Sequence, residues 1–418
     1  MLASPAHIAT WSIAASAIVG VIVRPWKMPE ALWAAVAALA LGALSLISWT
    51  DGAKAVLKGM DVYLFLTGMM LLAELARHEG LFDWLAARAA QQAKGSPTRL
   101  FGLVYLVGTV VTIFLSNDAT AVVLTPAVYA ATKQAKAKPL PYLFICAMIA
   151  NAASFVLPIS NPANLVVYGA HMPSLSTWLA EFTLASIMAI VVTFVVLRFT
   201  QRHELTGEIS REVQGSALSR GGRLVAGGIA ITAIVLLIAS SLDWQLGFPT
   251  FLAGTATAAT IMILNRLSPW AIAKGISWSV LPLVAGLFVL VNAVEGTGVL
   301  KPLITWLPSS ASASPNATAL VTGGIVAVLC NLLNNLPLGL IAGTVASGAQ
   351  LSPHVTGAML IGVDLGPNLS VTGSLATILW LIALRREGQV VSGWKFLALG
   401  CLVMPSALVA SLVTFLWL

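Results

Sequence analysis

The sequence predicts an all-α polytopic membrane protein built from two inverted repeats. Each repeat has five spans, one of which is a broken helix, and one re-entrant helical hairpin. Of its 418 residues, 58% are hydrophobic and 9% are charged, whereas a soluble domain carries about 25% charged residues. Apolar stretches of about 20 residues, long enough to cross the hydrocarbon core as helices, recur along the whole chain. This composition excludes a soluble protein, and a transmembrane β-barrel would need short alternating segments instead.

Ten apolar stretches are expected to be spans: 7–23, 30–49, 61–76, 140–170, 174–198, 223–242, 247–265, 277–294, 353–384 and 393–417. The stretches 140–170 and 353–384 are too long for one straight span, and Pro, Gly and Asn interrupt them at 157–164 and 366–374. Proline removes a backbone donor and glycine weakens a helix, so we expect two broken helices. Unwound backbone at this depth must face protein or a water-filled cavity.

Two further apolar stretches, 98–132 and 315–349, each contain a polar break near the centre. The breaks are Ser116-Asn117-Asp118 in the first stretch and Asn334-Asn335 in the second. We expect each stretch to be a re-entrant hairpin with its polar tip inside the membrane. Two full spans joined by a turn are the alternative for each stretch.

The second half of the chain repeats landmarks of the first half at a nearly constant offset. The matched pairs are Pro29 and Pro249, Gly68 and Gly286, Gly80 and Gly298, Asn117 and Asn335, and, at a slightly shorter offset, Asn161 and Ser374. A repeat of this length indicates duplication of a transporter half. We therefore expect a first repeat at 1–198, a cytoplasmic linker at 199–222 and a second repeat at 223–418. Five is an odd number of spans, so the second repeat runs inverted.

The positive charges support this topology. Of the 22 Lys and Arg residues, only Lys54, Lys58 and Lys301 fall on the less basic side. The positive-inside rule makes the other side cytoplasmic, so both termini are expected outside. The first hairpin then enters from the cytoplasm and the second from outside. Counting each hairpin as two full spans leaves the sides unchanged, so the charge bias does not decide re-entrance.

Three acidic residues in apolar segments are candidates for a functional charge. Asp118 lies at the first hairpin tip, Asp364 precedes the break in 353–384, and Glu74 lies late in span 61–76. We expect none of them to have a basic partner. A charge inside a membrane is costly and is a functional candidate by default, and a carboxylate without a cation is suited to take up and release a proton. The competing interpretation is a carboxyl that only caps a broken helix, and for Glu74 a position near the interface is favoured.

Four polar clusters are expected to meet at mid-membrane depth and to bind the substrate. Hairpin tips present free backbone amides, unwound helix ends present free carbonyls, and side-chain amides and hydroxyls supply further donors and acceptors. The alternative is that these residues only form hydrogen bonds to backbone groups that the helix breaks leave unpaired. The symmetric placement of four clusters argues against this alternative. The residues of this predicted site are Ser116, Asn117, Thr120, Ser160, Asn161, Asn164, Asn334, Asn335, Asn368, Thr372, Gly373, Ser374 and Thr377.

No Lys or Arg lies in these clusters, so the site suits a small neutral polyhydroxy solute, a cation, or an anion held by dipoles alone. Cys330 lies one turn before the second hairpin tip and could contact a soft metalloid, although a small core residue is the more common role. We expect no cofactor, no metal site and no nucleic-acid partner. No nucleophile–base set and no Gly-rich phosphate loop is visible in the sequence, which argues against an enzyme.

Four passages carry a family resemblance: FLSNDATAVVLTP at 114–126, LPISNPANL at 157–165, LNNLP at 333–337 and DLGPNLSVTGSLATILW at 364–380. In these passages, and over essentially its whole length, the chain resembles the arsenite permeases, the arsenical pump membrane proteins (ArsB) of the ion transporter superfamily. The resemblance implies a fold of two hairpins and two broken helices. It also implies proton-driven efflux of arsenite and antimonite, in some relatives with a partner arsenite-stimulated ATPase. Members of the family often carry an acid where this chain has Asn151, the position that matches Asp364.

The first hypothesis for function is secondary active efflux of arsenite and antimonite across the cell (inner) membrane. Efflux would occur by proton antiport, with Asp118 and Asp364 as the proton-coupling residues. Alternatives on the same fold are a sodium/proton antiporter and a sodium-coupled anion transporter, and a channel without coupling is a third class. Partnership with an ATPase subunit and assembly as a homodimer in the lipid bilayer are left open.

Overall fold

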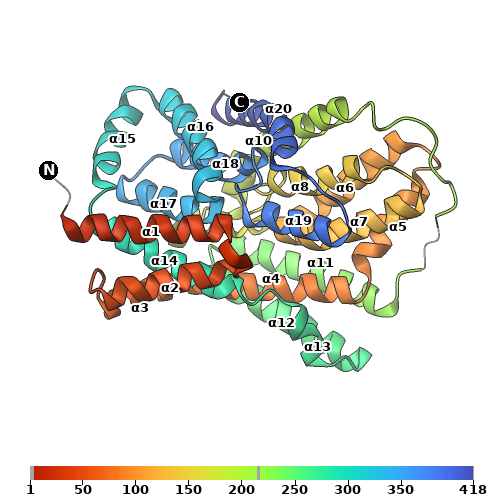
Figure 1. The fold of residues 1–418 in the computed structure, drawn as a ribbon, viewed down its shortest axis with the longest axis horizontal. Coiled ribbons are helices and arrows are strands. Elements are labelled where there is room, and N and C mark those ends of the chain that lie inside the picture. Colours follow the sequence, from red (N-terminus) through yellow and green to blue (C-terminus); the bar gives the residue numbers. More distant parts are fainter. Residues whose placement is uncertain (1–3, 214–216, 418) are drawn as a thin grey trace.

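The structure, a computed structural model, describes residues 4–213 and 217–417, and all secondary structure in these residues is helical (Figure 1). The first half contains α1 (Pro5–Val23), α2 (Glu30–Ala43), α3 (Trp49–Lys58), α4 (Met60–His78), α5 (Leu81–Gln92), α6 (Pro97–Phe114), α7 (Thr125–Gln134), α8 (Leu140–Ala152), α9 (Pro162–Tyr168) and α10 (Leu175–Thr200). The second half contains α11 (Arg220–Ser241), α12 (Gly247–Asn265), α13 (Pro269–Gly275), α14 (Val280–Gly296), α15 (Lys301–Ala313), α16 (Pro315–Leu333), α17 (Asn335–Gly348), α18 (Pro353–Leu365), α19 (Leu375–Arg386) and α20 (Gly393–Trp417).

Seven of the described helices are long and apolar enough to cross a membrane, or nine if each of two bent helix pairs is one span. The sequence predicted ten spans and two hairpins. The count differs because α2 is shorter than a span and because each broken helix is divided into short pieces, α8 with α9 and α18 with α19. The first limbs of both predicted hairpins, α6 and α16, are themselves long enough to cross. Re-entrance of the hairpins stays a prediction.

The order of helices in the second half repeats that in the first. In each half a short helix is followed by a longer one at a bend of 47°, α3 with α4 and α13 with α14. An amphipathic helix follows, α5 or α15, and then the two hairpin limbs, the broken helix and one long final helix. The element order therefore agrees with the repeat predicted from the sequence landmarks.

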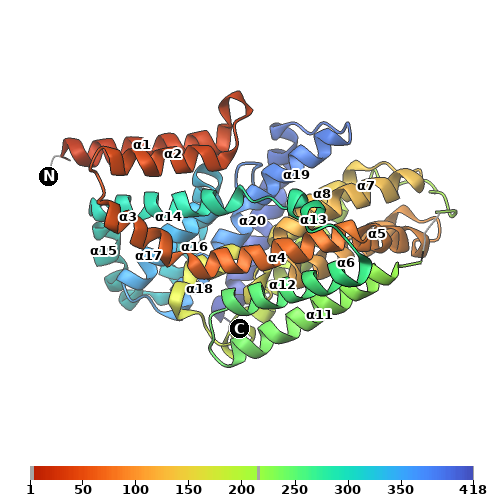
Figure 2. The same cartoon turned by 90° about the horizontal axis from the view of Figure 1, so that it is seen from below.

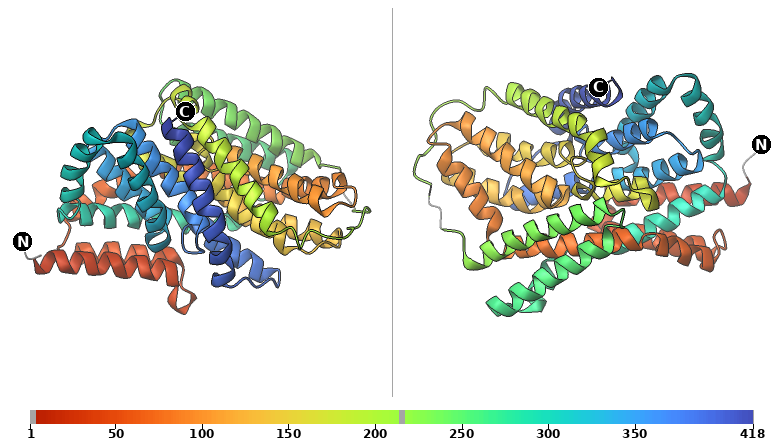
Figure 3. Two further views of the ribbon diagram at one scale, coloured as in Figure 1. Left: turned by 90° about the horizontal axis from the view of Figure 1, so that it is seen from above. Right: turned by 180° about the vertical axis from the view of Figure 1, so that it is seen from behind.

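The two halves contact each other extensively, because helices of one half pack along helices of the other half. α4 packs along α12, α14 packs along α2, and α10 packs along α20 (Figures 2 and 3). Glycines permit this close approach, since a Cβ on Gly68 of α4 would lie 2.3 Å from the Thr250 carbonyl oxygen of α12. Ser411 of α20 donates a hydrogen bond to the carbonyl of Ala185 on α10. Small residues at helix contacts are typical of membrane bundles, and here they join one half to the other.

Four interruptions of the helices lie where the sequence predicted polar breaks. Residues 115–118 separate α6 from a π-helical turn at Ala119–Leu124, and Asn334 alone separates α16 from α17. The broken helices are interrupted at 153–161, which includes the 3₁₀ turn Pro158–Ser160, and at 366–374, which begins with the 3₁₀ turn Gly366–Asn368. The predicted site residues lie in these four interruptions or within three residues of them.

The contact between α16 and α18 generates the first prediction. A Cβ on Gly362 of α18 would lie 2.3 Å from the carbonyl oxygen of Gly323 on α16, whereas a Cβ on Gly324 would meet nothing within 4 Å. We expect Gly362→Ala to lower the free energy of unfolding by about 1–3 kcal/mol because it overpacks the contact. Gly324→Ala should leave it unchanged or raise it by up to about 1 kcal/mol, since alanine favours a helix. Thermal unfolding of both purified variants measures the difference, and equal losses would contradict the close packing.

Candidate functional site

The two broken helices meet each other at their interruptions. Asn161, the N-cap of α9, accepts a hydrogen bond from the Ala163 amide through Oδ1 (3.0 Å). Its Nδ2 donates to the carboxylate of Asp364, at the end of α18. All of these groups are buried. One amide side chain therefore caps a helix of the first half and holds an acid of the second half.

A second contact between the broken helices mirrors the first. Ser374, the N-cap of α19, accepts a hydrogen bond from the Thr377 amide (3.1 Å) and lies 3.5 Å from Oδ1 of Asn151 on α8. Asn151 and Asp364 are 213 positions apart, as are Asn161 and Ser374. The two contacts thus join matching positions of the two halves, with an amide at Asn151 and an acid at Asp364.

Asp364 is fully buried, and one of its carboxylate oxygens has no partner among the described residues. Oδ1 receives the Asn161 amide, while Oδ2 receives nothing. No ion pair found in the described residues includes Asp364. An unpaired carboxylate oxygen in such surroundings is costly unless it carries a proton or meets a donor. The geometry therefore makes Asp364 a position where a proton or a donor-rich solute would be favoured.

The first hairpin tip brings Asp118 to a large cavity. Ser116 Oγ accepts from the Ala119 amide (3.1 Å), and Asn117 Oδ1 accepts from the Asp118 amide (2.9 Å). Thr120 shares a hydrogen bond with Thr112 of α6 (2.8 Å). The side chains of Ser116 and Asn117 thus accept hydrogen bonds from backbone amides at the interruption. The partly exposed Asp118 side chain lines the cavity.

The second hairpin tip is fixed by a strained residue. Asn334 has φ 72° and ψ 151°, a region that is almost restricted to glycine and costs about 1–3 kcal/mol in other residues. Its side chain donates to the Thr372 carbonyl (3.3 Å) and accepts from the Leu336 amide (3.4 Å). The Asn335 amide donates to the Gly373 carbonyl (2.8 Å). The tip is therefore bonded directly to the broken helix of its own half.

One of the predicted site residues mainly satisfies broken backbone. Asn164 Nδ2 contacts the carbonyls of Ser154, Leu157 and Pro158 at 2.9–3.4 Å. The alternative interpretation of the polar clusters thus describes this side chain best. Asn368 instead joins the two halves, because it accepts from Asn151 (2.9 Å) and donates to the Met148 carbonyl (3.0 Å), both on α8.

One residue of the network was not singled out from the sequence. Asn331 Nδ2 donates to the Gly366 carbonyl (3.0 Å), and its Oδ1 accepts from Ser370 (2.7 Å). Its position in the sequence could have identified it, because Asn331 lies next to Cys330 and one turn before Asn334. The Cys330 thiol is buried against the Gly362 and Val363 carbonyls, which agrees with a small core residue.

The large cavity has a volume of about 750 Å³, and its charges nearly balance. Its basic lining residues are Arg77, Lys274 and Arg386, and its acidic lining residues are Glu74, Asp83, Asp118 and Glu387. The cavity reaches Ser116, Asp118 and Pro162, next to Asn161. Such a lining does not concentrate anions, because electrostatic focusing needs walls with an excess of one sign.

The expectation that Glu74 lacks a basic partner was wrong. Its carboxylate binds Arg77 through two hydrogen bonds, from Nε at 2.8 Å and from Nη2 at 2.5 Å. Residues three apart on a helix are neighbours on its surface, so this pairing follows from the helix itself. Glu74 is therefore a paired charge beside the cavity.

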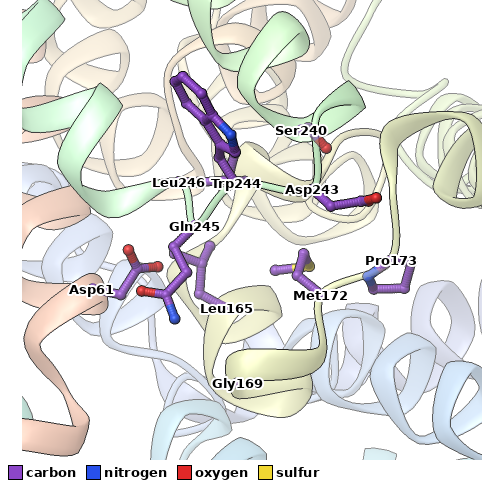
Figure 4. Close-up of a pocket in the computed structure, with 10 residues that line it drawn as sticks. All are labelled: Asp61, Leu165, Gly169, Met172, Pro173, Ser240, Asp243, Trp244, Gln245 and Leu246. Atoms are coloured by element: carbon purple, nitrogen blue, oxygen red, sulfur yellow. The ribbon is translucent and has the colours of Figure 1, made fainter.

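A much smaller pocket of about 30 Å³ lies at the other end of α9 (Figure 4). It is lined by Asp61, Leu165, Gly169, Met172, Pro173, Ser240, Asp243, Trp244, Gln245 and Leu246. Pro162 lines the large cavity and Leu165 lines this pocket, and the two residues are three positions apart on α9. The short helix α9 thus contributes residues to the linings of both spaces.

Helix interruptions that gather polar groups inside an apolar bundle are typical of α-helical membrane transporters. Residues 17–365 match the citrate transporter family (CitMHS), and the chain belongs to this family.

Known proteins resemble most of the chain. An arsenical pump membrane protein of Escherichia coli (strain K12) is 25% identical over 358 residues, 82% of this chain and 83% of that protein. An uncharacterized transporter of Mycobacterium tuberculosis is 24% identical over 371 residues, 86% of each protein. These relatives confirm the resemblance to the arsenite permeases. The solved structure of the Alcanivorax borkumensis YdaH transporter shares the fold, with a TM-score of 0.58 and 14% identity over 88% of this chain and 87% of that chain.

The strain at Asn334 gives the second prediction. Asn334→Gly should keep the fold, because glycine adopts this conformation freely. Asn334→Ala should be less stable than Asn334→Gly by about 1–3 kcal/mol, because alanine retains the strain. Both variants lose the same side-chain bonds, so thermal unfolding of the pair isolates the backbone effect. Equal stability would show that the conformation of Asn334 carries no strain.

Proposed function

We propose that this protein is a secondary carrier that exports arsenite and antimonite, as neutral trihydroxy species, in exchange for protons. The single observation that carries the proposal is Asp364, a buried carboxylate with an unpaired oxygen where the two broken helices meet. An uncompensated acid, with no Lys or Arg among the predicted site residues, favours a proton and a neutral, donor-rich solute over an anion. Relatives named as arsenical pump membrane proteins point the same way.

Proton and solute would compete for carboxylate oxygens. A trihydroxy solute has hydroxyl donors, which bind an ionised carboxylate better than a protonated one. Asp118 faces the cavity and is placed to receive such a solute first, with Asn117, Asn161, Asn335 and Ser374 as further hydrogen-bonding partners. A proton on Asp118 or Asp364 would weaken solute binding, and the solute would weaken proton binding equally, because such coupling is reciprocal. This competition is what exchange requires.

The proposed orientation places the large cavity on the cytoplasmic side. Three basic residues line that cavity, whereas the described lining of the small pocket includes two acids, Asp61 and Asp243, and no Lys or Arg. This distribution supports the positive-inside assignment, with termini outside, residues 199–222 cytoplasmic, and repeats at 1–198 and 223–418. Solute would then enter from the cytoplasm at the first hairpin tip.

A sodium-coupled anion carrier is the second candidate, because the family is described by citrate transport. The balanced charges of the cavity and the absence of Lys and Arg from the predicted site residues argue against a multivalent anion. Uptake into vesicles separates the two candidates. Arsenite exchange that needs a pH gradient and no sodium supports the first, and sodium-dependent citrate uptake without arsenite transport would replace it with the second.

The third prediction concerns the two acids. In vesicles with an imposed pH gradient, Asp118→Asn and Asp364→Asn should each lower proton-driven arsenite accumulation by about 5- to 150-fold, the range of typical coupling free energies. Asparagine keeps the size of the side chain and removes the titrating group. Asp51→Asn, at an exposed acid on α3, is the control and should accumulate arsenite normally. Full proton-driven accumulation by both site variants would overturn the coupling assignment, and downhill movement without proton flux in the parent would indicate a channel.

A further inference from the structure

The segment between α10 and α11 is polar in sequence, yet part of it is anchored to the helical bundle. Leu205, Ile209 and Val213, four positions apart, are all buried. In Figure 1 this segment runs along one end of the molecule, past the ends of α5 and α7. A free linker would leave these apolar side chains in water. The segment 204–213, called the strap below, is therefore docked.

Backbone hydrogen bonds join the strap to both ends of the first hairpin. The Ile209 amide donates to the carbonyl of Gly95 (3.1 Å), in the connection that leads into α6. The Ser210 amide donates to the carbonyl of Ala135 (2.8 Å), directly after α7. Gln91 Nε2 of α5 adds a bond to the Val213 carbonyl (3.2 Å). Adjacent strap residues thus bridge the entry and the exit of the hairpin.

Charged side chains extend the same contact. Lys138, shortly after α7, lies 2.8 Å from the carboxylate of Glu204. The hydrogen bond from Lys138, followed by its charge, lowers the pKa of Glu204 below its ordinary value. Both side chains are exposed, so this pair adds little stability. The backbone bonds and the buried apolar side chains hold the strap in place.

We propose that the strap holds the two ends of the first hairpin together and thereby sets the position of its tip, where Asp118 faces the cavity. The limbs α6 and α7 enclose the interruption at 115–118 and the π-helical turn Ala119–Leu124, so the separation of the limbs at their open end affects the position of the tip. A bridge across the open end of a hairpin limits the separation of its limbs. The strap stays docked throughout transport and is a positioning element, not a gate. This inference concerns the fold and holds whichever solute is carried.

Hydrogen exchange of the purified full-length protein tests the bridge without any substrate. Ser210→Pro removes the amide that donates to Ala135, and Ser210→Ala keeps it as the matched control. We expect amide exchange in α7 and at 95–100 to become about fivefold faster in Ser210→Pro, the effect of losing about one hydrogen bond. The second hairpin, α16 and α17, should be unchanged in the same sample. Unchanged exchange at α7, or equal acceleration in both hairpins, would overturn the proposal.

A cross-link tests the claim that the strap stays docked, and it does not depend on the stability of the proline variant. Ala135→Cys with Ser210→Cys, made with Cys401→Ser because Cys401 is the exposed native cysteine, is oxidised and assayed for transport. We expect arsenite exchange within about twofold of the reduced protein, a difference of under about 0.5 kcal/mol. Loss of exchange that a reductant restores would show that the strap must release. If reduced and oxidised samples are both inactive while the hydrogen-exchange result holds, the proposed substrate is wrong and the strap remains supported.

Discussion

Unpaired backbone groups inside an apolar bundle are the constraint on which this structure depends. Every interruption of a buried helix frees amides and carbonyls that lipid cannot satisfy. Asparagine side chains form hydrogen bonds to these freed groups at most of the breaks, because an asparagine amide can both donate and accept. Asn164 holds three carbonyls, and Asn334 holds an amide and a carbonyl. The remaining polar groups, which do not bond to the backbone, are the ones that we propose as contacts for a solute.

Much of the arrangement could be predicted from the sequence, because breaks in apolar segments are visible as Pro, Gly and Asn in positions where a span needs none. All four interruptions lie where such residues predicted them. The contacts between halves could not be predicted in this way. The bond from Asn161 to Asp364 joins residues 203 positions apart, and only the packing of α9 against α18 brings them together. Glu74 and Arg77 show the opposite case, since their spacing of three residues on a helix is sufficient to predict the pair.

The strap shows a further limit of reading a sequence by composition. The segment looks like a solvated connection because it is rich in charge, and three apolar residues four positions apart are too few to predict a buried face. Their burial depends on the shape of the surface below them, which the ends of α5, α6 and α7 provide.

The two halves also differ at Asn151 and Asp364. The approximate symmetry keeps the geometry of the contact there but places an ionisable group in one half only.

The short helix α9 has an electrical consequence. Pro162 and Leu165 border different spaces, and three residues of helix rise only about 4.5 Å. Where water and ions fill the spaces on both sides, a transmembrane voltage falls mainly across the thin insulating layer between them. A proton moved past this single turn would then experience most of that voltage, worth about 2.3 kcal/mol per 100 mV. A charge that passes this turn would therefore gain much of the electrical energy of a full crossing over a short path.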